Sequence, residues 1–122
     1  MCFTIVQKTE PKIRIAMENI ICYKTVQWSM RPEHYYVAPK YEIGKMYYAE
    51  DSEGRIKNLT LLREKWCGTK YRVYEGIHSY RRPLFELYRK TLKCIIPKGT
   101  KYLYSKADNE YVSTKIKPLE VI

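Results

Sequence analysis

Apolar and polar residues alternate with a period of two along much of the chain, which is the pattern of β-strands that bury one face. The clearest strand is predicted over residues 20–26, where β-branched and aromatic residues are dense, and it should cross the core at the centre of a sheet. Shorter strands are predicted over 2–6, ending before Pro11, and over 70–75. Residues 13–16 are ambiguous between strand and loop.

The last third of the chain predicts further strands that are joined by turns. A strand over 93–96, a turn over 97–100 and a returning strand over 101–105 together indicate a hairpin. Strands over 111–114 and 116–122 should complete the sheet.

Prolines and glycines interrupt the middle of the chain. Residues 28–39 contain two prolines around the trio Tyr35-Tyr36-Val37, which favours a loop or an edge strand. Gly44 divides the apolar run over 41–48, as expected for a strand broken by a bulge or tight turn. Residues 51–54 have the composition of a turn.

Two segments have apolar residues at helical spacing. Residues 55–66 predict a short amphipathic helix, with a strand as the alternative. The better helix is predicted over 82–92, because Ser79 can cap it and Pro83 suits an early helical position. Its apolar face would consist of Leu84, Leu87, Tyr88 and Leu92. The expected fold class is therefore α+β: one small domain over 1–122, mainly antiparallel sheet with one or two short helices.

Charge is distributed unevenly over the 122 residues, a length that suits one domain with a single core. The formal net charge is +10, and residues 54–106 contain fourteen Lys or Arg against three Glu. Such a concentrated positive field predicts an anionic partner, which could be a nucleic acid, a nucleotide or an acidic protein. The alternative is a solvated basic face that only keeps the protein soluble.

The sequence shows no clear targeting segment and no cysteine spacing typical of disulfides. The apolar opening is too short for a signal-peptide core, and no apolar run approaches the roughly 20 residues that cross a bilayer. We therefore expect a cytoplasmic protein with no membrane partner. The cysteines are scattered singly, which favours reduced and mostly buried thiols over disulfides. They are Cys2, Cys22, Cys67 and Cys94.

No residue set typical of catalysis is recognisable. His34 lies between prolines without a nearby second ligand, so we expect no metal site there. The serines and cysteines do not lie in a nucleophile motif, and Glu50, Asp51 and Glu53 cluster in a predicted turn that solvent would occupy. The sequence therefore predicts a protein that is not an enzyme and needs no cofactor or metal.

Residues 76–82 (GIHSYRR) form the best candidate binding site. They are expected to end a strand and open onto the predicted helix, whose N-terminus would add positive charge. Arg81 and Arg82 would hold a phosphate, His78 would donate or accept a hydrogen bond, and Tyr80 would stack on a base. The alternative for His78 is a structural histidine in a hydrogen bond.

Tyrosines interleaved with cations extend this prediction. The chain has thirteen tyrosines, several of them next to Lys or Arg. Phenol rings can stack on bases while cations bind phosphates, although tyrosine is also a good strand former and most of these rings should be structural. Lys24 and Arg72, each beside a tyrosine on a predicted strand, complete the predicted ligand-binding set.

Five short segments are similar to parts of small proteins from phages, prophages and mobile elements. They are residues 1–5 (MCFTI), 21–24 (ICYK), 41–47 (YEIGKMY), 76–80 (GIHSY) and 94–102 (CIIPKGTKY). Some small phage proteins of this style are sponges that sequester cyclic or ADP-ribose-derived nucleotide signals of Thoeris or CBASS defence. A weaker likeness, to degenerate ADP-ribosyltransferase-like domains, depends on Tyr23 and Lys24 followed by the Gly-x-His of 76–78, and no catalytic glutamate is identifiable for it.

The resemblance and the residues together predict a non-enzymatic phage protein that binds and sequesters an anionic nucleotide-type ligand. We expect a homo-oligomer whose basic second half lines the pocket. One alternative is a DNA- or RNA-binding protein. The other is an inhibitor that docks on an acidic host enzyme.

Overall fold

The computed structural model describes residues 3–6, 12–30, 40–49, 63–66, 70–73, 76–106 and 109–122. For 3–6, 63–66 and 70–73 the description covers the backbone only. Some predictions lie outside the described residues: the loop over 31–39 with His34, the acidic turn over 50–54, the segment 55–62, and the thiols of Cys2 and Cys67.

Antiparallel strands make up all the regular structure of the described residues. No described residue is helical, so none belongs to a helix long and apolar enough to span a membrane. The strands are β1 (Phe3–Val6), β2 (Arg14–Ile15), β3 (Ile20–Gln27), β4 (Tyr47–Tyr48), β5 (Arg63–Trp66), β6 (Lys70–Val73), β7 (Ile77–Tyr80), β8 (Arg89–Ile96), β9 (Lys101–Ser105), β10 (Glu110–Ser113) and β11 (Lys115–Val121).

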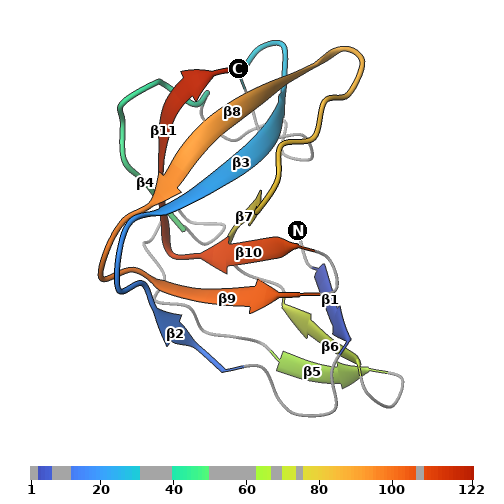
Figure 1. Ribbon diagram of the computed structural model, residues 1–122. Helices are drawn as coiled ribbons and strands as arrows, with labels where there is room; N and C mark the ends of the chain where they lie inside the picture. The colour runs from blue at the N-terminus through green and yellow to red at the C-terminus, as the bar shows by residue number, and fades with distance from the viewer. Residues whose placement is uncertain are drawn as a thin grey trace.

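The larger sheet has eight strands in the order β2-β9-β10-β7-β3-β8-β11-β4. Its two halves meet between β7 and β3, where the register contains the single pair Tyr23 and Tyr80. Figure 1 shows β3 and β8 running steeply across the direction of β9 and β10. The chain crosses from one half to the other at three short connections, from β2 to β3, β8 to β9 and β10 to β11, and also along the longer loop from β7 to β8. Such corners let one sheet fold over its own core.

A smaller sheet has three strands in the order β1-β6-β5. It confirms the strands predicted within 2–6 and 70–75, and over 63–66 it confirms the strand alternative to the amphipathic helix. The predicted central strand is also confirmed, because β3 lies between β7 and β8. The strands predicted near the C-terminus correspond to β10 and β11.

One face of the larger sheet carries the main core, and we call it the core face. Opposite residues in an antiparallel pair project to the same side, so the register that pairs Cys22 with Cys94 stacks the apolar positions of β3 and β8 together. The buried residues of this core are Ala16, Cys22, Val26, Tyr41, Ala49, Ile77, Leu92, Cys94, Ile96 and Ile116.

The turn over 97–100 is confirmed, but the hairpin built on it is wrong. Gly99 has a positive φ of 86°, and the Thr100 amide donates to the Pro97 carbonyl at 3.1 Å. However, β8 pairs with β3 and β11, whereas β9 pairs with β2 and β10. The Gly99 amide donates instead to the Ala16 carbonyl at 2.8 Å, which ties the turn to the end of β2 and makes it a corner of the sheet.

The helix predicted over 82–92 is wrong. Residues 81–88 are irregular and Tyr88 has a φ of 61°, which no right-handed helix allows. Leu84 and Leu87 are exposed, while Leu92 is fully buried in β8 opposite Lys24. Because β8 pairs with β3 along eight residues, this tertiary pairing and the burial of Leu92 outweigh local helical preference. The antiparallel sheet of the predicted fold class is confirmed, and its helices are absent from the described residues.

The break predicted at Gly44 is present. Gly44 has a φ of 85°, and its amide donates to the Pro118 carbonyl of β11 at 2.8 Å. After this turn the chain forms β4, an edge strand that pairs with β11. Residues 41–43, before the glycine, are not a strand.

Candidate functional site

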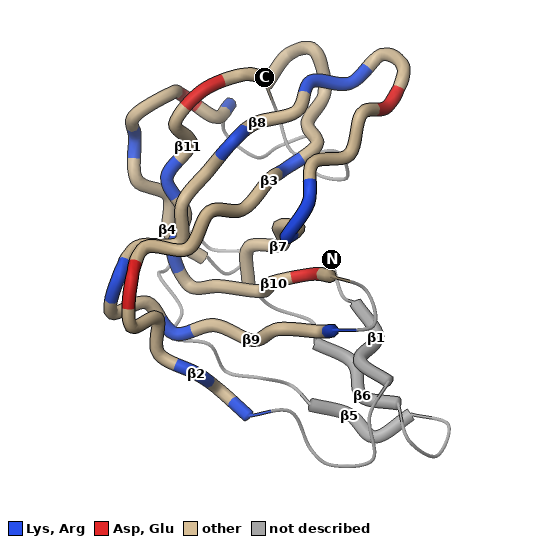
Figure 2. The backbone as a smooth tube through the Cα atoms, in the orientation of Figure 1, with Lys and Arg blue, Asp and Glu red and all other residues tan. Residues whose placement is uncertain are grey.

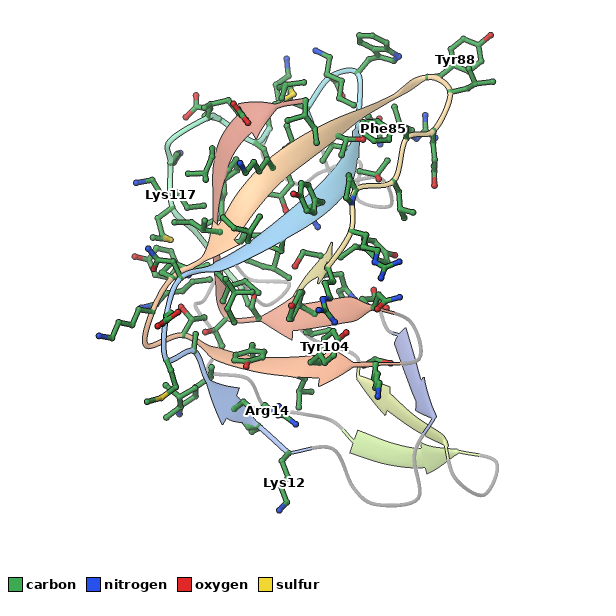
Figure 3. All side chains as sticks on the ribbon, viewed as in Figure 1. Lys12, Arg14, Phe85, Tyr88, Tyr104 and Lys117 are labelled. Carbon is green, nitrogen blue, oxygen red and sulfur yellow. The ribbon has the colours of Figure 1, made fainter. Side chains whose placement is uncertain are left out.

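Three tyrosines form a row across β9 and β10. Alternation along β9 places Tyr102 and Tyr104 on the same face, and the β9–β10 register places Tyr111 opposite Tyr104. The ring centroids of Tyr104 and Tyr111 are 4.9 Å apart, and those of Tyr102 and Tyr111 are 6.0 Å apart in an edge-on arrangement. All three side chains are partly exposed. We call this set the tyrosine row; Tyr104 is labelled in Figure 3.

Arg81 lies at one end of the tyrosine row. Its Nη1 lies 3.5 Å from the Tyr104 hydroxyl, and its backbone amide donates to the Asn109 carbonyl at 2.8 Å. The Tyr104 hydroxyl also donates to Oδ1 of Asn109 at 3.4 Å. Asn109 has a φ of 50°, a conformation that asparagine tolerates better than most residues. A single turn residue therefore orients both the arginine and the terminal ring.

The electrostatics of the row keep Arg81 charged and the Tyr111 phenol protonated. The hydrogen bond to Tyr104 raises the pKa of Arg81. Burial, followed by the proximity of Tyr104, raises the pKa of Tyr111, against a smaller lowering by Arg81. At the other end of the row, Arg14 is opposite Tyr102 in the β2–β9 register and is exposed. The site thus combines three tyrosine rings with a cation at each end.

His78 faces away from Arg81 and the tyrosine row. It is 7% exposed, and its Nδ1 lies 3.2 Å from Oε1 of Glu110, which is equally buried. By the alternation of β7, His78 projects to the side opposite the core face, beside Val112. This arrangement matches the alternative in which His78 is a structural histidine in a hydrogen bond.

Lys24 is held inside the fold. Its Nζ donates to the backbone carbonyl of His78 and lies 5.7 Å from the centroid of the Tyr41 ring. The Lys24 ammonium is therefore bound by β7 and packed against Tyr41 on the core face.

The other three predicted residues lie at separate places in the structure. Arg82 is exposed next to Arg81, and Tyr80 is partly buried opposite Glu110 in the β7–β10 register. Arg72 is opposite Thr4 in the β1–β6 register, on a strand whose side chains are not described. No helix follows β7, so the expected helical N-terminus does not contribute to the charge at Arg81.

The two described thiols are buried and free, as predicted for these cysteines. Cys22 and Cys94 are directly opposite each other in the β3–β8 register. Burial raises the pKa of Cys22 to about 11 and that of Cys94 to about 12. The thiolate, which is the reactive form, is therefore scarce at neutral pH. Among the residues with described side chains, no three His, Cys, Asp or Glu cluster closely enough to hold a metal ion.

Comparisons with protein-family models, with curated proteins and with solved structures found no match. What the site binds must therefore be inferred from its own side chains: three tyrosine rings, a guanidinium at one end that contacts Tyr104, and a second cation at the other.

Five residues of the site were not among the predicted ones: Arg14, Tyr102, Tyr104, Asn109 and Tyr111. The alternation of Tyr102 and Tyr104 around an apolar Leu103 could have indicated that two rings share one face. The position of Tyr111 depends on the β9–β10 register, and the role of Asn109 depends on its positive φ. Neither can be derived from residue type alone.

Proposed function

We propose that this protein binds an anionic nucleotide-type ligand at the tyrosine row and does not transform it. The observation that carries the proposal is the guanidinium of Arg81, exposed at the end of the row and oriented by Tyr104 and Asn109. A guanidinium binds phosphate oxygens in a planar, two-pronged geometry. The rings beside it offer the flat surfaces on which bases stack.

The row favours a ligand with a ring over a simple anion. A bare phosphate would use Arg81 and leave the phenol rings without a role. A nucleotide uses both, because its base can pack against the Tyr104–Tyr111 pair while its phosphate lies against Arg81. Arg14, beside Tyr102, provides a second cation for a ligand with two phosphates.

A site that binds its ligand without transforming it is consistent with the state of the nearby thiols and histidine. Cys22 and Cys94 are protonated at neutral pH, and His78 is paired with Glu110 on the other side of the sheet. Neither arrangement supplies an activated nucleophile or a base that could reach the row.

In this proposal the protein is a phage-encoded sponge. It would sequester a cyclic or ADP-ribose-derived nucleotide that a host uses as a defence signal, and it would do so as a homo-oligomer. The resemblance of its short segments to small phage proteins supports this role. A tight binder without turnover is what sequestration requires.

Isothermal titration tests the proposal with cyclic dinucleotides, cyclic trinucleotides and cyclic ADP-ribose isomers, and with inorganic phosphate as a control. We expect at least one nucleotide to bind at micromolar protein, and intact ligand to be recovered after heating. Arg81→Ala should weaken binding at least tenfold, because it removes the charge-assisted bonds. Lys98→Ala, an exposed cation in the turn after β8, should have no effect. Failure of every nucleotide to bind would refute the proposal.

A further inference from the structure

A second surface lies at the end of the sheet where β3 ends and β8 begins. Four large apolar side chains are exposed there: Trp28 at 63%, Phe85 at 73%, Leu87 at 86% and Tyr88 at 77%. The β3–β8 register pairs Gln27 with Arg89, which brings Trp28 beside the loop between β7 and β8. Figure 3 labels Phe85 and Tyr88 on this loop, with Tyr88 at its far end. We call these four residues the aromatic tip.

Hydrogen bonds hold the loop that carries the aromatic tip. The Thr91 hydroxyl donates to the Leu84 carbonyl, and the Arg89 amide donates to the Glu86 carbonyl at 3.3 Å. Tyr88 adopts its positive φ of 61°, and its carbonyl accepts a bond from Nη1 of Arg89 at 3.1 Å. Phe85, Leu87 and Tyr88 are therefore exposed on a loop whose backbone is held by hydrogen bonds.

Cations lie directly beside these rings. Nζ of Lys90 is 5.1 Å from the centroid of the Trp28 ring, and Arg89 follows Tyr88. Arg82 lies near the start of the same loop, and Glu86 is the loop's one acidic residue. Figure 2 shows basic positions on both sides of this loop and along β8. Exposed aromatic groups of this size usually mark an interaction surface.

We propose that the aromatic tip binds single-stranded nucleic acid. Bases would stack on the rings of Trp28, Phe85 and Tyr88, while Arg89 and Lys90 contact the phosphates. A duplex is a poorer ligand because its base faces are already stacked. A second copy of the chain is disfavoured because it would bring the same cations together.

An acidic protein could match the cations of the tip, but the observations favour a single strand. A protein pocket that accepted the rings would also have to desolvate Arg89 and Lys90, which is costly unless each charge is well paired. A single strand leaves these charges in water, since its phosphates lie outside its bases. This surface is separate from the tyrosine row, and its proposal does not depend on the nucleotide site.

Fluorescence anisotropy tests the proposal with labelled oligo(dT) and oligo(U) of about 20 nucleotides, longer than a typical single-strand site. The combined variant Trp28→Ala with Tyr88→Ala should lose at least tenfold in affinity. Tyr48→Ala is the matched control, because Tyr48 is also exposed and has the Lys115 ammonium 5.6 Å from its ring centroid, but it lies on the edge strand β4. Circular dichroism should show that both variants fold.

Trp28 also provides a direct readout. The chain has two tryptophans, so Trp66→Phe leaves Trp28 as the sole source of tryptophan emission. Stacking should quench its emission as oligo(dT) binds, and Lys90→Ala should reduce the slope of affinity against salt.

Equal affinity of the wild type and the Trp28→Ala, Tyr88→Ala variant would overturn the proposal, as would unchanged Trp28 emission or equally tight binding of a duplex. Binding of poly-glutamate, but of no oligonucleotide, would instead identify the tip as a surface for acidic proteins. The Trp28→Ala, Tyr88→Ala variant should bind cyclic nucleotides in calorimetry as the wild type does, so the fates of the two proposals can be told apart.

Discussion

Gly76 lies where β7 begins against β10, and replacing it with alanine should strongly destabilise the fold. A Cβ on Gly76 would be 2.2 Å from Cγ1 of Val112, and Gly76 has a φ of 129°, which side-chain-bearing residues rarely adopt. Overpacking of this kind costs about 1–3 kcal/mol, and the strained backbone adds a similar amount. We therefore expect Gly76→Ala to lower the free energy of unfolding by about 2–6 kcal/mol.

A double-mutant cycle with Val112→Ala separates the two contributions. Val112→Ala removes the methyl group that the new Cβ would strike, but it leaves the φ strain at residue 76 in place. The double variant should thus be more stable than the sum of the single variants predicts, by about 1–3 kcal/mol. Urea unfolding, followed by circular dichroism, measures all four proteins. Additivity within about 0.5 kcal/mol would show that the close approach of Gly76 to Val112 is not what excludes a side chain there.

Two further predictions concern the thiols and the turn that holds Arg81. The pKa of Cys22 is raised from 9.0 to about 11, so the unfolded chain loses this proton at a lower pH than the native protein does. The stability that the thiol contributes is complete below pH 9.0 and should fall as the pH rises toward about 11. Urea titrations over this range should show a shallower fall for Cys22→Ala with Cys94→Ala, and an equal fall would refute the assignment. Asn109→Gly keeps the positive φ accessible but removes the acceptor for Tyr104, so nucleotide affinity should drop severalfold in calorimetry while the midpoint of thermal unfolding changes little. Unchanged affinity would show that Asn109 does not orient the site.

Most strands could be predicted from local sequence, because period-two alternation and β-branched residues mark a half-buried strand wherever it lies. β3 and the segments around β9, β10 and β11 are of this kind. The helix expected over 82–92 failed for a physical reason. Its leucine spacing is compatible with a helix, but Leu92 is buried by pairing with β3, more than sixty residues earlier in the chain.

The candidate site was likewise predicted in part from local sequence and decided in part by the tertiary structure. Arg81 was identified from its place in a glycine-bearing, basic segment, and His78 from the same residues. Side chains alternate between the two faces along β7, and Arg81 follows that strand three positions after His78, so the two side chains project to opposite sides. His78 turned toward Glu110 inside the fold, and Arg81 toward Tyr104 at the surface.

The sequence by itself determined the strand-rich character of this protein, its excess of positive charge, and the supply of tyrosines beside cations, because these properties depend on residue type and local spacing. The tertiary structure decided which of those residues meet. Tyr104 and Tyr111 pack together because β9 pairs with β10, and Trp28 joins Tyr88 because β3 pairs with β8. Strand pairing depends on burial summed over the whole sheet, so no local pattern contains it.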